Sequence, residues 1–108
     1  MLDRAPALLK LGVYRNITDD LEYTIHLKKD STFDYTIRYE WPVEFTHGTW
    51  RIDRKTLVLN SVNDTAISTP GVQIGKYIML FNQRFEIKKN KLVEIDRARM
   101  KYKFVGTE

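Results

Sequence analysis

The chain has 108 residues and a formal net charge of +4, and 43% of its residues are hydrophobic, 12% aromatic and 30% charged. This size and mix are typical of one folded domain, 1–108, and exclude a disordered chain. The absence of cysteine excludes disulfides, thiolate nucleophiles and cysteine-based metal sites. No apolar run approaches about 18 residues, so we expect no membrane-spanning helix, and residues 1–11 read as a lead-in and not as a secretory signal.

The first predicted strands lie between residues 12 and 41. A strand begins at Gly12, and residues 21–28 (LEYTIHLK) then alternate strictly between apolar and polar side chains. Residues 32–41 (TFDYTIRYEW) alternate in the same way, and the turn cluster KDS separates the two runs. Period-two alternation is typical of a strand with one buried face, so the two runs predict an antiparallel hairpin whose second strand ends at Pro42.

The middle of the chain predicts two more strands and the longest loop. The first strand carries Gly48, Trp50 and Ile52 on one face, and the turn at 53–55 separates it from a strand with Leu57 and Leu59. Residues 61–71 (SVNDTAISTPG) are rich in turn formers and predict the loop.

The last part of the chain predicts four strands, at 72–81, 84–89, 91–96 and 100–105, the first with a bulge or bend at Gly75. The total is eight or nine strands with few helix signals. Short connections predict an all-β antiparallel meander. A meander with one apolar face buries that face most completely by closing, so we expect a small barrel.

Three segments within 12–61 carry a resemblance to a known family: Gly12-Val13-Tyr14, LEYTIHLKKDSTFDY at 21–35 and GTWRIDRKTLVLNS at 48–61. The pattern resembles small lipocalin-like (calycin-type) barrels of bacterial envelope proteins. It is also similar to the N-terminal barrel of the outer-membrane lipoprotein linked to copper resistance and envelope stress. That lipoprotein pattern has a Cys-x-x-Cys pair, which this chain lacks, so a copper or redox role does not carry over. The resemblance implies a non-enzymatic protein that is periplasmic or associated with the outer membrane, and it implies no particular ligand.

The aromatic residues on the predicted inward faces are the strongest candidates for a binding site. Either they fill the barrel, or they line a pocket for a flat or acyl hydrophobic ligand, with tyrosine hydroxyls as its polar groups. We expect Trp50 to plug the barrel and Gly48, on the same face, to let the strand bend around it. The residues expected around a ligand are Tyr23, Phe33, Tyr35, Tyr39, Trp50 and Tyr77.

Residues capable of catalysis or metal binding form no recognisable motif. His26 and His47 lie on separate predicted strands without the spacing of a metal site. Asp34 and Glu40 flank Arg38 on a polar strand face, which is typical of solvated cross-strand pairs. No nucleophile elbow, phosphate loop or dinucleotide fingerprint is present, so we expect no enzyme activity, cofactor or metal.

The excess positive charge lies in the last quarter of the chain, where residues 84–108 hold eight Lys/Arg against four Asp/Glu. Such residues commonly coat solvent faces and protect strand edges. Basic residues 84–103 also offer a peripheral contact with an anionic membrane. Two alternatives to ligand binding stay open: a protein-interaction adaptor with a filled core, and single-stranded nucleic-acid binding by aromatic and basic residues. The acidic residues between the aromatics make the nucleic-acid partner the less favoured one.

Overall fold

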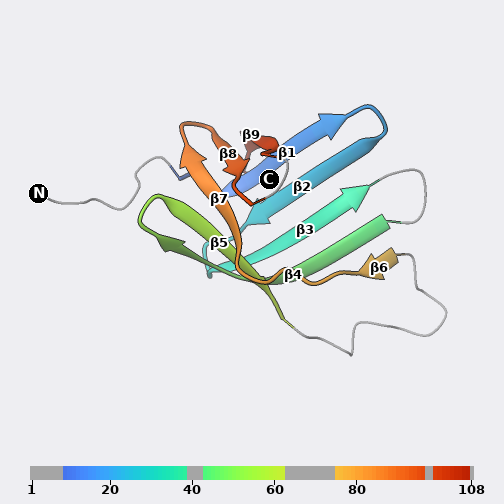
Figure 1. The fold of residues 1–108 in the computed structure, drawn as a ribbon, viewed down its shortest axis with the longest axis horizontal. Coiled ribbons are helices and arrows are strands. Elements are labelled where there is room, and N and C mark those ends of the chain that lie inside the picture. Colours follow the sequence, from blue (N-terminus) through green and yellow to red (C-terminus); the bar gives the residue numbers. More distant parts are fainter. Residues whose placement is uncertain (1–8, 39–42, 63–74, 97–98, 108) are drawn as a thin grey trace, which may run out of the picture.

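The protein forms nine β-strands in a computed structural model that describes residues 9–38, 43–62, 75–96 and 99–107 (Figure 1). Tyr39 and most of the predicted loop at 61–71 lie outside the described residues. The strands are β1 (Gly12–Thr18), β2 (Leu21–Leu27), β3 (Thr32–Arg38), β4 (Val43–Asp53), β5 (Thr56–Ser61), β6 (Gly75–Tyr77), β7 (Gln83–Lys88), β8 (Lys91–Glu94) and β9 (Lys101–Gly106).

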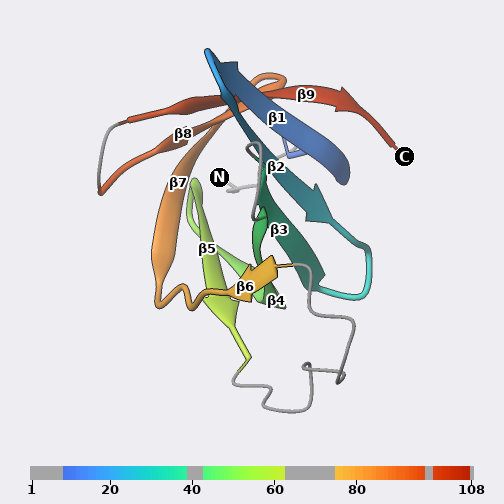
Figure 2. The ribbon, with the colours of Figure 1, turned by 90° about the vertical axis from the view of Figure 1, so that its right-hand side faces the viewer.

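Eight of these strands form a closed antiparallel barrel. The sheet order is β3-β2-β1-β9-β8-β7-β5-β4-β6, and β3 also pairs with β4, which completes the circle. The first and last strands are neighbours, because Arg15 of β1 lies opposite Lys103 of β9. Figure 2 shows the strands curving around a common interior. The all-β meander predicted from the alternating runs is therefore confirmed.

The hairpin of β2 and β3 shows why the alternation of apolar and polar residues predicted these strands correctly. Leu27 lies opposite Phe33, and Ile25 lies opposite Tyr35. All four side chains are buried in the core, whereas Asp34 between them is exposed. Alternate residues of a strand point to opposite faces, so one correct register places the whole apolar set inside.

Strand β4 bends around the barrel and pairs with different partners along its length. Its first part pairs with β3 and its second with β5, and Gly48 belongs to both pairings. A Cβ atom added at Gly48 would lie 2.0 Å from the backbone oxygen of Asn60. Glycine is therefore required because β5 approaches the backbone too closely for any side chain.

Strand β6 departs from the expectation. Residues 72–81 were expected to form one antiparallel strand, but within the described part only Gly75–Tyr77 is strand, and it pairs in parallel with the start of β4. The amide of Ile78 still donates to the Phe45 carbonyl of β4 at 2.9 Å, but the chain then leaves β4, and the amide of Leu80 donates to the Ser61 hydroxyl at 2.8 Å. The alternation of residues within 72–81 could not predict this, because the pairing of β6 with β4 depends on contacts between segments far apart in the sequence.

Candidate functional site

The two ends of the barrel differ. At one end, hereafter the closed end, lie the tight turns that join β2 to β3, β4 to β5 and β7 to β8. At the other, hereafter the open end, the chain passes from β5 through β6 to β7 and from β8 to β9. Leu9 and Leu11 pack against the core, and Tyr14 fixes this lead-in, since its hydroxyl donates to the Lys10 carbonyl at 2.7 Å.

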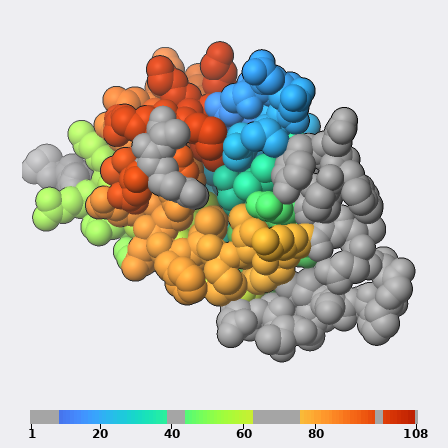
Figure 3. Space-filling view, turned by 45° about the vertical axis from the view of Figure 1, so that its right-hand side comes forward, coloured from blue at the N-terminus to red at the C-terminus, as the bar shows by residue number. Residues whose placement is uncertain are grey.

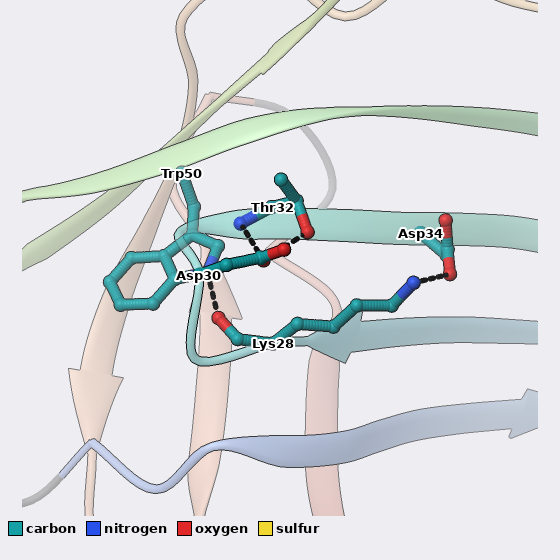
Figure 4. Close-up of polar contacts among 5 residues, drawn as sticks. All are labelled: Lys28, Asp30, Thr32, Asp34 and Trp50. Carbon is teal, nitrogen blue, oxygen red and sulfur yellow. Dashed lines mark hydrogen bonds and ion pairs between the residues drawn. The ribbon is translucent and has the colours of Figure 1, made fainter.

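Trp50 lies at the closed end, beside the turn that joins β2 to β3 (Figure 4). Its indole nitrogen donates a hydrogen bond to the Lys28 carbonyl at 3.0 Å, and its backbone amide donates to the Ser31 carbonyl at 2.9 Å. Half-buried indoles of this kind combine an apolar ring with one placed donor. Trp50 packs against the core and ties β4 to the turn.

The turn itself is held by polar contacts. Asp30 accepts hydrogen bonds from the backbone amide and the hydroxyl of Thr32, and these bonds lower the pKa of the Asp30 carboxyl below its ordinary value. Across the hairpin, the ammonium group of Lys28 lies 2.8 Å from an Asp34 carboxylate oxygen, which raises the pKa of Lys28 (Figure 4). These exposed contacts stabilise the turn. The Asp34 carboxylate is exposed to solvent and forms an ion pair with Lys28.

The middle of the barrel is filled by side chains. Large residues that are less than 2% exposed occupy it: Tyr14, Ile25, Leu27, Phe33, Leu57, Leu59, Phe85, Leu92 and Tyr102. A small eight-stranded barrel holds little more than its own side chains, so the interior is packed at this level. Any space for a ligand inside the barrel must therefore lie toward an end, and a separate hollow of about 690 Å³ lies on the outer face, lined by polar residues such as Arg15, His26 and Asp34.

A cavity of about 450 Å³ opens at the open end. It is lined by Tyr23, Tyr35, Ile37, Glu44, Ile78, Met79, Leu80, Glu94 and Met100. In Figure 3 the corresponding segments meet on one face of the molecule: the β1–β2 hairpin in blue, β3 in teal and the residues after β6 in orange. Seven of the nine lining residues are apolar or aromatic and two are carboxylates, and polar and apolar atoms contribute comparably to the surface of the cavity.

One wall of the cavity is irregular backbone fixed to the barrel. The Ser61 amide donates to the Leu80 carbonyl at 2.9 Å, and the hydroxyls of Thr46 and Ser61 lie 2.6 Å apart. The amide of Ile78 donates to the Phe45 carbonyl at 2.9 Å. Because its backbone groups are bonded to β4 and β5, this segment presents Ile78 and Leu80 to the cavity at fixed positions.

Beneath the cavity, its lining residues Tyr23 and Tyr35 meet the fully buried Tyr102. The hydroxyls of Tyr35 and Tyr102 lie 3.0 Å apart, and the rings of Tyr23 and Tyr102 meet edge to face with centroids 6.3 Å apart. Burial, above all, raises the pKa of Tyr102 far above its ordinary value, with Tyr35 and Glu94 adding to the effect. Tyr102 is therefore a neutral hydrogen-bonding group.

Glu94 is a buried carboxylate beside this group, with a side chain on the cavity wall and only 3% exposure. It accepts a hydrogen bond from the Gln83 side-chain amide at 3.2 Å. Buried carboxylates are rare because desolvation penalises the charged form, and they persist when hydrogen-bonded. The cavity thus combines apolar walls with a few placed oxygen atoms.

The structure brings together some of the residues expected around a ligand and separates others. Tyr23 and Tyr35 line the cavity. Phe33 lies deeper, in the filled core, and Trp50 lies at the closed end. Tyr39 falls outside the described residues.

Tyr77 lies apart from the cavity. Its ring meets those of Phe45 and His47 edge to face, each with centroids 5.6 Å apart. Its hydroxyl donates to the Val62 carbonyl at 2.6 Å and lies 3.1 Å from the His47 carbonyl. Tyr77 therefore anchors β6 to β4 and to the end of β5.

Of the nine residues that line the cavity, only Tyr23 and Tyr35 were expected around a ligand, and Glu94 and the adjacent Tyr102 were not singled out from the sequence. A signal for Tyr102 was present, because Lys101 and Lys103 flank it and alternation then turns it inward. For Glu94 the signal is ambiguous, since Leu92 on its own face and Val93 on the other are both apolar and both buried.

The described residues considered for metal binding or acid–base chemistry, His26, Asp34 and His47, lie on the outer faces of their strands. Asp34 lies opposite His26 on β2 and opposite His47 on β4. Within the described ranges, no group of three or more His, Cys, Asp or Glu residues lies close enough to hold a metal ion. Glu40 falls outside the described residues, so its relation to Asp34 is not defined.

No protein-family model, no curated protein and no solved structure matches this chain. Among the described residues, no helix is long and apolar enough to cross a membrane.

Proposed function

We propose that this protein is a non-catalytic barrel that binds a small hydrophobic ligand in the cavity at the open end. The observation that carries the proposal is the cavity itself: about 450 Å³, with apolar walls from Ile37, Ile78 and Leu80. Pockets for small ligands typically have volumes of about 300–1,000 Å³ and few polar groups. The filled middle of the barrel leaves this end as the part of the interior that can admit a ligand.

The polar atoms of the cavity define how such a ligand is oriented. Tyr23 and Tyr35 stand on neighbouring strands, and the Tyr35 hydroxyl is already fixed by Tyr102. A ligand with an apolar body and one hydrogen-bonding group would place the body against Ile37 and Leu80 and the polar group toward the tyrosines. Burial of the apolar body would supply most of the ligand's affinity, and hydrogen bonds to the tyrosine hydroxyls would fix its orientation.

The closed eight-stranded barrel is compatible with a lipocalin-like protein. Membership of that family, and the envelope location that the resemblance implies, are part of the proposal. They rest on the segments at 12–14, 21–35 and 48–61, which belong to β1, to β2 and β3, and to β4 and β5.

A cavity-filling substitution tests the proposal. Ile37→Trp places an indole in the cavity, and we expect it to reduce the affinity for Nile red, a neutral apolar dye, by about tenfold or more. Ile17→Trp is the matched control, because Ile17 is 69% exposed on β1. If both variants bind the dye as the unaltered protein does, and both keep its thermal stability, the cavity is not the binding site.

A second candidate function is that of a protein-interaction adaptor, and exposed apolar side chains favour it. Phe81 is 72% exposed just before β7, and Ile17 is 69% exposed at the end of β1. Both lie toward the open end. A photo-crosslinking residue at position 81 should then capture a discrete partner, whereas one at the exposed closed-end residue Arg54 should not.

Nucleic-acid binding has less support, because Phe33 and Tyr35 are buried and out of reach of a base.

A further inference from the structure

Basic side chains form a row across the outer wall of the barrel on four neighbouring strands. On β7 and β8, Lys88 lies opposite Lys91. On β8 and β9, Lys91 lies opposite Lys103, which in turn lies opposite Arg15 of β1. Each of the four is adjacent to a buried, inward-facing residue of its own strand, namely Tyr14, Ile87, Leu92 or Tyr102, so the four side chains share the outer face. We call these four residues the basic row.

Protection of a strand edge does not explain the basic row. Lysines often lie on edge strands, where they discourage pairing between molecules. Strands β7, β8 and β9 have no free edge, because each is hydrogen-bonded to a neighbour on both sides in the closed barrel. Like charges directly opposite each other on paired strands are unfavourable, so the fold alone gives no reason for this arrangement.

The basic row is only partly neutralised. Arg15 lies 3.0 Å from Glu22, and Lys88 lies 3.4 Å from Glu86. Arg99 also contacts Glu86, at 3.8 Å. In contrast, Lys91, Lys103 and the neighbouring Lys101 form no ion pair with any described acidic residue.

We propose that the outer wall of β7, β8 and β9 docks onto an anionic lipid surface through Lys91, Lys101 and Lys103. The wall presents its charges on regular strands and so fits a broad anionic surface. Val105 lies on the same face of β9 as Lys101 and Lys103 and is 51% exposed, which supplies an apolar contact for the interfacial region.

The same wall is poorly suited to nucleic acid. Binding of single strands relies on exposed aromatic side chains that stack on bases. On β9, Tyr102 is buried, and Phe104 is half-buried with the Lys10 ammonium 5.3 Å from its ring centroid. Proteins that recognise double-stranded DNA insert a helix or a β-ribbon into a groove. This wall is a continuous barrel surface and offers no such projecting element.

The strength of the contact follows from the number of lysines. A basic residue near an anionic membrane surface adds about fivefold to the partition coefficient, so three add about 100-fold. The attraction falls off within about 10 Å at 0.1 M salt. Binding should therefore be reversible and strongly dependent on salt.

Vesicle sedimentation tests the proposal. The full chain is mixed with vesicles of phosphatidylcholine alone, or of equal parts phosphatidylcholine and phosphatidylglycerol, in about 50 mM salt. The test variant combines Lys91→Gln, Lys101→Gln and Lys103→Gln. The control variant removes the same charge from other exposed positions: Lys29→Gln, Arg51→Gln and Lys76→Gln.

We expect sedimentation with the anionic vesicles only, a loss of about 100-fold in the test variant, and a loss of less than about fivefold in the control. Equal losses in the two variants would overturn the proposal, because net charge and not the wall would then govern binding. Tighter binding to a short RNA duplex than to anionic vesicles would also overturn it, in favour of a nucleic-acid partner. So would the absence of binding to both.

Discussion

The Tyr35 hydroxyl lies 3.0 Å from the Tyr102 hydroxyl, although the two residues are 67 positions apart in the sequence. Tyr35 belongs to β3 and Tyr102 to β9, and β2 and β1 lie between these strands in the sheet order. The bond therefore crosses the interior of the barrel. It ties opposite walls together beneath the proposed ligand cavity.

Removal of the Tyr102 hydroxyl should destabilise the barrel. Tyr102→Phe deprives Tyr35 of this buried partner, and we expect the free energy of unfolding to fall by about 1–2 kcal/mol. Urea denaturation measures the change. Tyr23→Phe is the matched control, because the Tyr23 hydroxyl forms no hydrogen bond with another described residue, and it should cost less. Equal costs for the two variants would show that the bond across the barrel contributes nothing.

Alkaline pH should destabilise the protein through Tyr102. Burial raises the pKa of its hydroxyl in the folded state, whereas in the unfolded chain this hydroxyl loses its proton near pH 10. Above about pH 10 the folded state therefore binds more protons than the unfolded state, so stability falls as pH rises. Below about pH 10 this contribution is fully present. Urea midpoints between about pH 9 and 11 should fall less steeply in Tyr102→Phe than in the unaltered protein. An identical slope would contradict the assignment.

The hairpin of β2 and β3 could be predicted from the sequence because its information is local. Each strand alternates with period two, and a short turn fixes the register, so Ile25, Leu27, Phe33 and Tyr35 were all expected inside and are buried. Trp50 was expected to plug the barrel, and it packs against the core at the closed end. Its bond to the Lys28 carbonyl could not be predicted, because it depends on where β4 bends.

The open end was harder to predict because its contacts are long-range. Tyr77 was expected near the ligand on the assumption that 72–81 continues the antiparallel order. Instead β6 pairs in parallel with β4, and the ring of Tyr77 meets Phe45 and His47. Glu94 was not singled out because each face of β8 carries one charged and one apolar residue, so alternation did not indicate which face points inward.

A side chain at Gly48 should be incompatible with the observed barrel. The Cβ of Gly48→Ala would lie 2.0 Å from the Asn60 oxygen, and that atom belongs to backbone in the β4–β5 ladder and cannot turn aside. We expect a loss of about 3 kcal/mol in the free energy of unfolding, the upper range for overpacking. Thr49→Ala, at the exposed neighbouring position, is the control and should cost less than about 1 kcal/mol. Similar values for the two variants would mean that β5 lies farther from β4 than the structure places it.

Native mass spectrometry of the protein, purified gently from its own host, tests the central claim most directly. The account predicts the 12.8 kDa chain with an adduct of a few hundred daltons, the size class that a cavity of about 450 Å³ admits. The adduct should be lost on denaturation and should be absent from Ile37→Trp prepared in the same way. A bare mass from every gentle preparation, with Nile red also failing to bind, would contradict a ligand-binding barrel and leave the adaptor function as the better account.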